Sequence, residues 1–224
     1  MANEIKVFAD KEAMSQAFVD KLASLALSPL KVALSGGSTP KRAYELLYKS
    51  EIDRSKLNLY MVDERYVPIT DERSNERIMR EALHLEEGFA FHPMYREGGP
   101  QAAAEAYDQL LRKEVDRFDV VLLGMGPDGH TASIFPNMWP EIPTPDTWCV
   151  ASKAPVVCED RITLTPRAII QAEQTIFMIA GPDKIEALKQ VLTPTPDESL
   201  PAKYIARQTP HCEIWLDQPT ADLL

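Results

Sequence analysis

Short apolar runs alternate with amphipathic segments along the whole chain, and this alternation strongly constrains the fold. The runs that read as strands cover residues 5–8, 30–34, 57–62, 118–123, 148–152, 161–164, 175–180 and 212–216. Continuous apolar runs are typical of strands buried on both faces of a parallel sheet. The pattern therefore predicts an α/β fold, a doubly wound and mostly parallel sheet flanked by helices, of the Rossmann-like type.

The segments between these runs carry the start signals of helices. Asp10 and Ser74 each stand where a side-chain oxygen can cap the first turn of a helix. Pro40 and Pro100 suit the first turn of two others, because proline has no N–H to leave unpaired there. A further helix is expected over 182–192.

Length and composition favour one folded domain over residues 1–224. A chain of 224 residues with 45% hydrophobic and 26% charged residues is typical of a globular protein. It can bury a sufficient core without disulfides or a metal. No internal repeat or long linker divides the chain, and residues 88–100 and 193–201 are expected to be surface loops.

The charge balance limits the partners. Lys and Arg number 24 and Asp and Glu 34, which gives a net charge of −10. Such a field repels nucleic acid and anionic membranes, so neither is expected as a partner. A small anionic substrate remains compatible, because a few cations in one loop can override a diffuse negative surface.

Cysteine usage and the absence of targeting signals favour a cytoplasmic protein. Cys149, Cys158 and Cys212 are far apart and lack the spacing of a disulfide framework or a zinc site. No secretory signal is visible, and no apolar run is long enough to span a bilayer.

Glycine is scarce and concentrated in two loops that follow predicted strands. Of nine glycines, five lie there: Gly36, Gly37, Gly124, Gly126 and Gly129. Ligands of open α/β sheets bind at the carboxyl ends of the strands. Residues 35–40 place backbone N–H groups and hydroxyls at a helix start, which favours a phosphate. The Gly-Lys-Ser/Thr ending of a P-loop is missing, and a tight capped turn is the alternative.

The second loop, 124–131, contains a candidate general base. Its glycines match the spacing of the dinucleotide fingerprint, but no clear strand-terminal acidic residue follows about 20 positions on. Pro136 and Asn137 would also end any helix after one or two turns, so no nucleotide cofactor is predicted. His130 follows in a polar setting, where a neutral imidazole can accept a proton near pH 7. Asp128 either orients that ring or makes an Asx turn.

Charged residues at the expected sheet edge are further candidates. Asp63 and Arg65 end a buried strand, either as a solvated charge run or as groups facing a substrate. Arg161 and Lys184 are additional cations, each of which by itself reads as a surface charge. Ser133 lies too close to His130 in sequence to indicate a catalytic triad, and no G-x-S-x-G elbow is present.

Taken together, six segments carry a family resemblance. They are ALSGGSTP at 33–40, VDERYVP at 62–68, SN at 74–75, LLGMGPDGHTASIFP at 122–136, RITLT at 161–165 and AGPDK at 180–184. In this order they resemble the 6-phosphogluconolactonase family, within the larger group of sugar-phosphate isomerases and glucosamine-6-phosphate deaminases. Deaminases usually carry Asp-Glu-Tyr at the position of 63–65 and Asn-Gly-His at 128–130, so both differences favour the lactonase branch.

The resemblance implies hydrolysis of 6-phospho-D-glucono-1,5-lactone to 6-phospho-D-gluconate in the oxidative pentose phosphate pathway, with no metal and no cofactor. It implies that His130 activates water, and that Asp63 and Arg65 also belong to the catalytic group. Asp128 joins this group as the possible orienting carboxylate. The resemblance also implies the substrate-binding residues Gly36, Gly37, Ser38, Thr39 and Lys184. Arg161 is added to them on a weaker match to the family.

The chemistry of a lactone agrees with these residues. Its carbonyl is already electrophilic and its leaving alkoxide stays tethered, so a base, an oxyanion stabiliser and a phosphate anchor should suffice. Either Arg65 or loop N–H groups could stabilise the oxyanion. The alternatives are a deaminase or isomerase of a sugar phosphate, and a non-catalytic sugar-phosphate-binding regulator. Monomer and homodimer both remain open.

Overall fold

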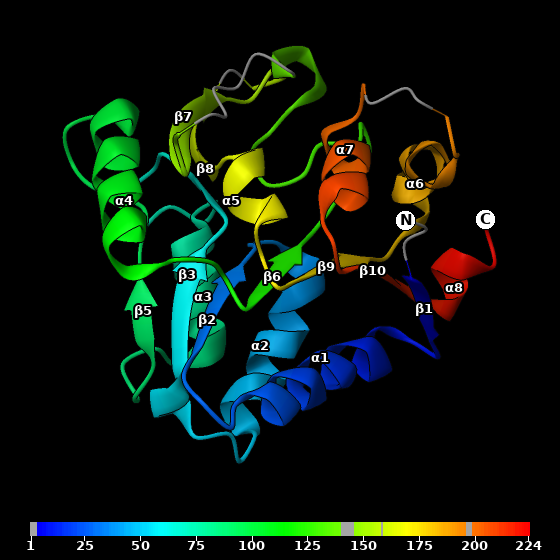
Figure 1. The fold of residues 1–224 in the computed structure, drawn as a ribbon, viewed down its shortest axis with the longest axis horizontal. Coiled ribbons are helices and arrows are strands. Elements are labelled where there is room, and N and C mark those ends of the chain that lie inside the picture. The colour runs from blue at the N-terminus through cyan, green and yellow to red at the C-terminus, as the bar shows by residue number, and fades with distance from the viewer. Residues whose placement is uncertain (1–3, 140–145, 158, 196–198) are drawn as a thin grey trace.

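Six of the eight apolar runs of the sequence lie in one parallel sheet at the centre of the molecule (Figure 1). The computed structural model describes residues 4–139, 146–157, 159–195 and 199–224. The seven strands of this sheet are β1 (Glu4–Phe8), β2 (Leu30–Leu34), β3 (Leu57–Met61), β5 (Ala90–His92), β6 (Val120–Leu123), β9 (Gln174–Ile179) and β10 (Cys212–Asp217). Their order is β1-β10-β9-β6-β2-β3-β5, and each neighbouring pair is parallel.

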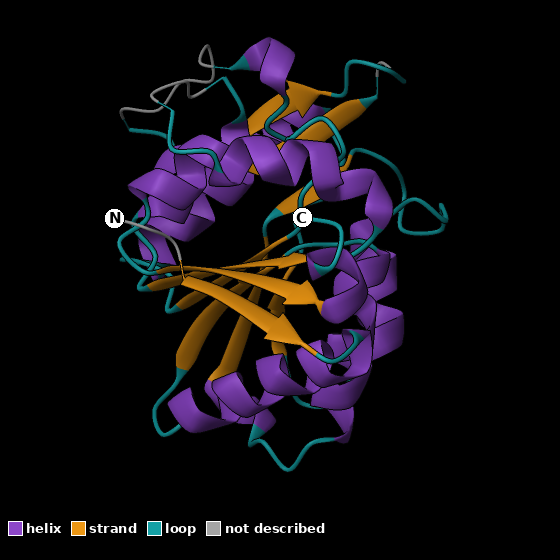
Figure 2. Cartoon of the chain, turned by 90° about the vertical axis from the view of Figure 1, so that its right-hand side faces the viewer, coloured by secondary structure: helices purple, strands orange, loops and turns teal. Residues whose placement is uncertain are grey.

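Helices cover both faces of the sheet, as the edge-on view of Figure 2 shows. They are α1 (Lys11–Leu25), α2 (Ser38–Lys49), α3 (Asn75–Leu83), α4 (Pro100–Glu114), α5 (Pro166–Ile170), α6 (Ile185–Leu192), α7 (Pro201–Gln208) and α8 (Gln218–Ala221). Among the described residues, the 3₁₀ turns are η1 (Arg54–Lys56), η2 (Pro136–Met138) and η3 (Pro182–Lys184). The layers confirm the predicted doubly wound α/β class.

The predicted helix starts are present. Asp10 accepts a hydrogen bond from the backbone N–H of Ala13 at 2.8 Å, and Ser74 caps α3 in the same way. Pro40 lies in the first turn of α2, and Pro100 opens α4. Each proline therefore occupies a position where its missing N–H costs no hydrogen bond.

A small second sheet was not predicted. It is antiparallel, in the order β4 (Asp63–Arg65), β8 (Asp160–Leu164) and β7 (Cys149–Lys153). Figure 1 shows β7 and β8 at the top of the molecule, above the carboxyl end of the main sheet. The charged segment 63–65 is thus a strand, and its pairing with β8 places Arg65 opposite Arg161.

Two loop predictions need correction. Residues 88–100 are not entirely a loop, because β5 pairs with β3 there. The loop expected over 193–201 ends where α7 begins at Pro201, and its residues 196–198 lie outside the described residues. The helices α5, α7 and α8 also had no counterpart among the predictions.

The core lies between the main sheet and its helices. All four residues of β6 are buried, and the largest fully buried side chains include Tyr44, Phe18 and Phe118. Full burial of one such apolar side chain contributes about 1.5–3 kcal/mol. Cys149 and Cys212 are buried free thiols, and Cys158 lies outside the described residues. No helix in the described part of the chain is long and apolar enough to cross a membrane.

Candidate active site

A cleft of about 560 Å³ opens at the carboxyl ends of the central strands. It is lined by Lys11, Asp63, Arg65, Asn75, Arg161 and the segments 35–40, 124–127, 130–132 and 178–184. Every predicted site residue except Asp128 contributes to this lining. The fold therefore brings together segments that are far apart in the sequence, at the edge where α/β sheets bind ligands.

The loop 35–40 presents a helix start to the cleft. Gly37 precedes α2 and makes no side-chain cap, and Ser38, Thr39 and Pro40 form the first turn. The free N–H groups and the helix dipole of such a start favour an anion. A side chain at Gly36 would displace Asn75, because an added Cβ would lie 2.0 Å from Oδ1 of Asn75.

Two lysines lie on the same side of the cleft. Nζ of Lys184, at the end of η3, lies 2.8 Å from Oδ2 of Asp183. The hydrogen bond from Lys184 holds the pKa of the Asp183 carboxyl below its usual value, and the charge of Lys11 acts in the same direction. Lys11, at the first position of α1, is a lining residue that the sequence did not indicate.

His130 stands in a tight turn that fixes its imidazole. Oδ1 of Asp128 lies 2.5 Å from Nδ1 of His130 and accepts its backbone N–H at 3.1 Å. Gly126 donates its N–H to the carbonyl of His130, and a Cβ on Gly126 would lie 2.1 Å from the ring. Asp128 therefore makes both the Asx turn and the ring contact, which the sequence left open as alternatives.

Opposing effects set the ionisation of Asp128. Partial burial by itself raises the pKa of the Asp128 carboxyl. The hydrogen bond from His130 and the charge of His130 together lower it by more than burial raises it, so the pKa lies below its usual value. Asp128 is thus a carboxylate throughout the pH range in which histidine side chains titrate.

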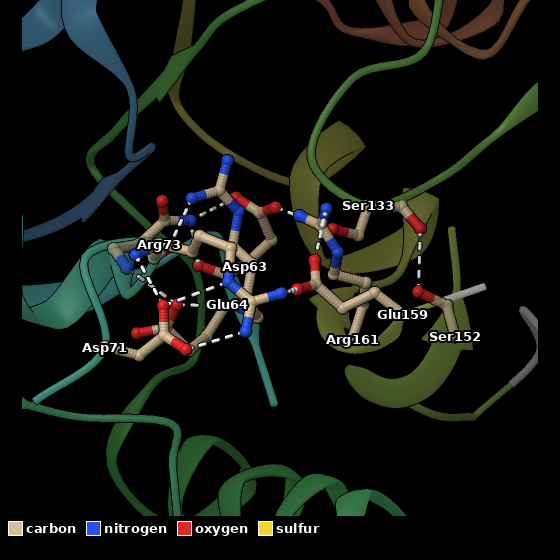
Figure 3. Close-up of polar contacts among 10 residues, drawn as sticks. Asp63, Glu64, Asp71, Arg73, Ser133, Ser152, Glu159 and Arg161 are labelled. Atoms are coloured by element: carbon tan, nitrogen blue, oxygen red, sulfur yellow. Dashed lines mark hydrogen bonds and ion pairs between the residues drawn. The ribbon is translucent and has the colours of Figure 1, made fainter. Parts of the chain in front are cut away.

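Asp63 is buried in the wall of the cleft and held by hydrogen bonds (Figure 3). Its Oδ2 accepts a hydrogen bond from Oγ of Ser133 at 2.7 Å, and its carbonyl accepts one from Nδ2 of Asn75 at 3.0 Å. The carbonyl of Ser133 in turn accepts from Oγ of Ser152 at 2.9 Å. These contacts connect β4, α3 and β7 with the segment that follows His130.

Arg65 and Arg161 lie opposite each other on β4 and β8. Arg65 donates through Nη1 to the carbonyl of Arg73, and Arg161 pairs with Glu159 at 2.7 Å. Arg73 also pairs with Glu159, at 2.6 Å (Figure 3). Burial and the charge of Arg65 lower the pKa of Arg161. The buried Nε atoms of Arg65 and Arg161 have no hydrogen-bond partner within the described part of the chain.

Glu64, between Asp63 and Arg65, has a structural role instead. Its carboxylate accepts the N–H groups of Arg65, Asn75 and Glu76 at 2.7 Å each, and the hydroxyl of Ser74 at 3.0 Å. Burial raises the pKa of Glu64 to about 7, and these donors act in the opposite direction. The side chain fastens the start of α3 to β4 and is not among the residues that line the cleft.

The sequence pattern indicates no functional role for Lys11, Tyr44 or Asn75, and it does not support Ser133 as a nucleophile. The only signal for Asn75 and Ser133 was their place in the matching segments SN and GHTASIFP. In the described part of the chain, no group of three or more His, Cys, Asp and Glu side chains could hold a metal ion.

Fold and cleft together define a doubly wound α/β protein with a ligand cleft at the carboxyl edge of its sheet. The chain belongs to the family of glucosamine-6-phosphate isomerases/6-phosphogluconolactonases, whose model matches residues 9–215.

Individual relatives agree with this membership. A 6-phosphogluconolactonase of Thermotoga maritima is 35% identical over 177 residues, which cover 78% of each chain. One of Rhizobium meliloti is 32% identical over 222 residues, covering 93% of this chain and 95% of the relative. The crystal structure of a 6-phosphogluconolactonase from Shewanella baltica superposes with a TM-score of 0.86 at 30% identity, over 96% of this chain and 97% of the other.

Proposed function

We propose that this chain hydrolyses 6-phospho-D-glucono-1,5-lactone to 6-phospho-D-gluconate, a step of the oxidative pentose phosphate pathway. One observation carries the proposal: the same cleft is lined by His130, whose ring contacts Asp128, and by the uncapped start of α2. A base and an anion site in one cleft suit a phosphorylated substrate that needs only activated water. The proteins of Thermotoga maritima and Rhizobium meliloti described above carry the name of this activity.

In this proposal the substrate's phosphate occupies the loop at the start of α2. The N–H groups of Gly36, Gly37, Ser38 and Thr39 and the hydroxyls of the last two supply donors, and Lys184 supplies a charge. Anchoring the phosphate there holds the lactone ring in the cleft. C1 of the lactone can then lie beside His130. Because the reacting groups are held together in this way, the attack of water takes place within one complex.

His130 is the proposed general base. If Nδ1 carries a proton toward the carboxylate of Asp128, Nε2 is left free to take a proton from water. The water oxygen then bonds to C1, and the carbonyl π electrons move to the carbonyl oxygen. When that oxyanion re-forms the carbonyl, the bond between C1 and the ring oxygen breaks. The proton held by His130 passes to the departing ring oxygen, which becomes the C5 hydroxyl.

The proposed role of the two arginines is to stabilise negative charge that develops on the carbonyl oxygen. Arg65 and Arg161 line the cleft and are held by Arg73 and Glu159. Asp63, fixed by Ser133, lies beside them, and its attraction favours the charged form of Arg161. Donors that are fixed before the reaction stabilise such an oxyanion more than mobile ones do.

Product release distinguishes this proposal from the alternatives. The chain should release acid from freshly prepared 6-phosphogluconolactone faster than the spontaneous rate, and should release no ammonia from glucosamine 6-phosphate. Ammonia release without lactonase activity would identify a deaminase. Binding of either sugar phosphate without turnover would identify a regulator. We further propose that the protein acts in the cytoplasm, without a metal or cofactor, as a monomer or homodimer.

A further inference from the structure

Tyr44 lies behind the loop at the start of α2, outside the cleft. It is in the second turn of that helix, its side chain is fully buried, and its hydroxyl donates a hydrogen bond to the carbonyl oxygen of Ser35. Burial, together with the nearby charge of Asp63, raises the pKa of Tyr44 well above its usual value. The hydroxyl therefore remains a protonated donor at any physiological pH.

This bond fixes the peptide unit between Ser35 and Gly36. The N–H of Ser35 donates to the carbonyl of Leu122 at 3.1 Å, which ties the residue to the end of β6. In a planar trans peptide the C=O and the following N–H point in opposite directions. Since the carbonyl of Ser35 is directed at buried Tyr44, the N–H of Gly36 is directed away from Tyr44. Gly36 itself is among the residues that line the cleft.

The other side of Gly36 is held by Asn75. A Cβ on Gly36 would lie 2.0 Å from Oδ1 of Asn75, so the amide packs directly against this backbone. Nδ2 of Asn75 is itself fixed by the carbonyl of Asp63 at 3.0 Å. The loop is therefore confined between Asn75 and Tyr44, and Tyr44 supplies the hydrogen bond that sets the direction of the peptide.

We propose that Tyr44 is a positioning residue for anion binding, which keeps the N–H of Gly36 directed into the cleft. The inference rests on the proposed function, because it assumes that the loop binds the phosphate of the substrate. Without the hydroxyl, the carbonyl of Ser35 loses its partner and the peptide can rotate. The loop then presents one donor fewer to the phosphate, while His130 on its separate loop is unaffected.

The test compares Tyr44→Phe with the wild type on 6-phosphogluconolactone and on unphosphorylated gluconolactone. Because a charge-assisted hydrogen bond to the phosphate is weakened, KM for the phosphorylated lactone should rise about 5- to 30-fold. KM for gluconolactone and kcat for both substrates should stay within about twofold. The inhibition constant of inorganic phosphate against gluconolactone hydrolysis should rise by a factor similar to that for KM.

Tyr107→Phe is the matched control. Tyr107 is also a buried tyrosine whose hydroxyl bonds to backbone groups, at 2.9 Å from the N–H of Met61 and 3.2 Å from the carbonyl of His92, but it does not line the cleft or touch the loop. Removal of the Tyr107 hydroxyl should lower the melting temperature about as much as Tyr44→Phe does. It should leave KM for both lactones unchanged. An equal rise of KM in both variants would overturn the proposal, because it would indicate general loosening of the core.

The outcomes also separate this inference from the proposed function. If the wild type binds phosphorylated and unphosphorylated lactones equally well, the proposal that the loop at the start of α2 binds phosphate is wrong. If the wild type prefers the phosphorylated lactone and folded Tyr44→Phe keeps the same preference, only the role of Tyr44 is wrong. Should Tyr44→Phe fail to fold, Tyr44→Met gives a second reading, since it has a flexible apolar side chain without the hydroxyl.

Discussion

Oδ1 of Asp128 lies 2.5 Å from Nδ1 of His130, two residues later in the same turn. The carboxylate that orients the proposed base therefore belongs to the loop that carries the base. Its second contact, to the backbone N–H of His130 at 3.1 Å, fixes the carboxylate itself. A substitution in this turn should therefore alter the position of the imidazole while leaving the rest of the fold largely unchanged.

Asp128→Asn should lower kcat about 10- to 10³-fold and leave KM nearly unchanged. An asparagine amide can donate to Nδ1 and so favour the tautomer with the proton on Nε2, which cannot act as a base. Because the side chain of Asp128 is partly exposed, the melting temperature should change little. Steady-state kinetics and a thermal melt check this. A kcat within a few-fold of the wild type would show that Asp128 only shapes the turn.

Gly126→Ala should also lower kcat, through sterics alone. The added Cβ would lie 2.1 Å from Nδ1 and Cε1 of His130, so the ring must move. We expect a loss of at least about 10²-fold, since small displacements of a catalytic group are costly. Gly124→Ala is the control, because its Cβ would meet no atom within 4 Å. Equal kcat values for the two variants would show that catalysis does not require the observed position of the His130 imidazole.

Lys184→Ala and Thr39→Ala should raise KM for the phosphorylated lactone far more than for gluconolactone. Loss of a charge-assisted contact costs about 1.5–3 kcal/mol, or roughly 10- to 150-fold in affinity. Lys189→Ala is the control, because Lys189 lies in α6 but does not line the cleft, and it should change neither KM. Parallel losses on both substrates would show that this loop does not hold the phosphate.

Activity should survive exhaustive chelation. In the proposed reaction the lactone carbonyl is electrophilic enough for water activated by an imidazole, so no Lewis acid is required. Rates before and after treatment with EDTA, followed by removal of the chelator, give the measurement. A loss that a divalent cation restores would contradict the mechanism.

Much of the fold could be predicted because its central strands are apolar and its helices carry explicit start signals. The strand at 30–34 was predicted with the observed limits, and Asp10 caps α1 as expected. The second sheet could not be predicted, since β4 is a charged segment of three residues that is recognisable only through its pairing with β8. The same holds for β5, which is too short to show a period.

The site was predictable only where function leaves a local pattern. Glycine-rich loops after strands and a histidine in one of them pointed to the cleft directly. The contact of Ser133 with Asp63 joins residues 70 positions apart, and no spacing rule encodes it. Tyr44 follows the apolar period of its helix, so the sequence marks it as a core residue, and only the structure shows its bond to Ser35.

The kcat of His130→Asn most directly tests the claim that His130 is the base. After the spontaneous hydrolysis of the lactone is subtracted, kcat should be about 10²–10⁴-fold below that of the wild type, with KM nearly unchanged. A folded His130→Asn protein with kcat within a few-fold of the wild type would contradict the account and move the base to Asp63 or Asp128.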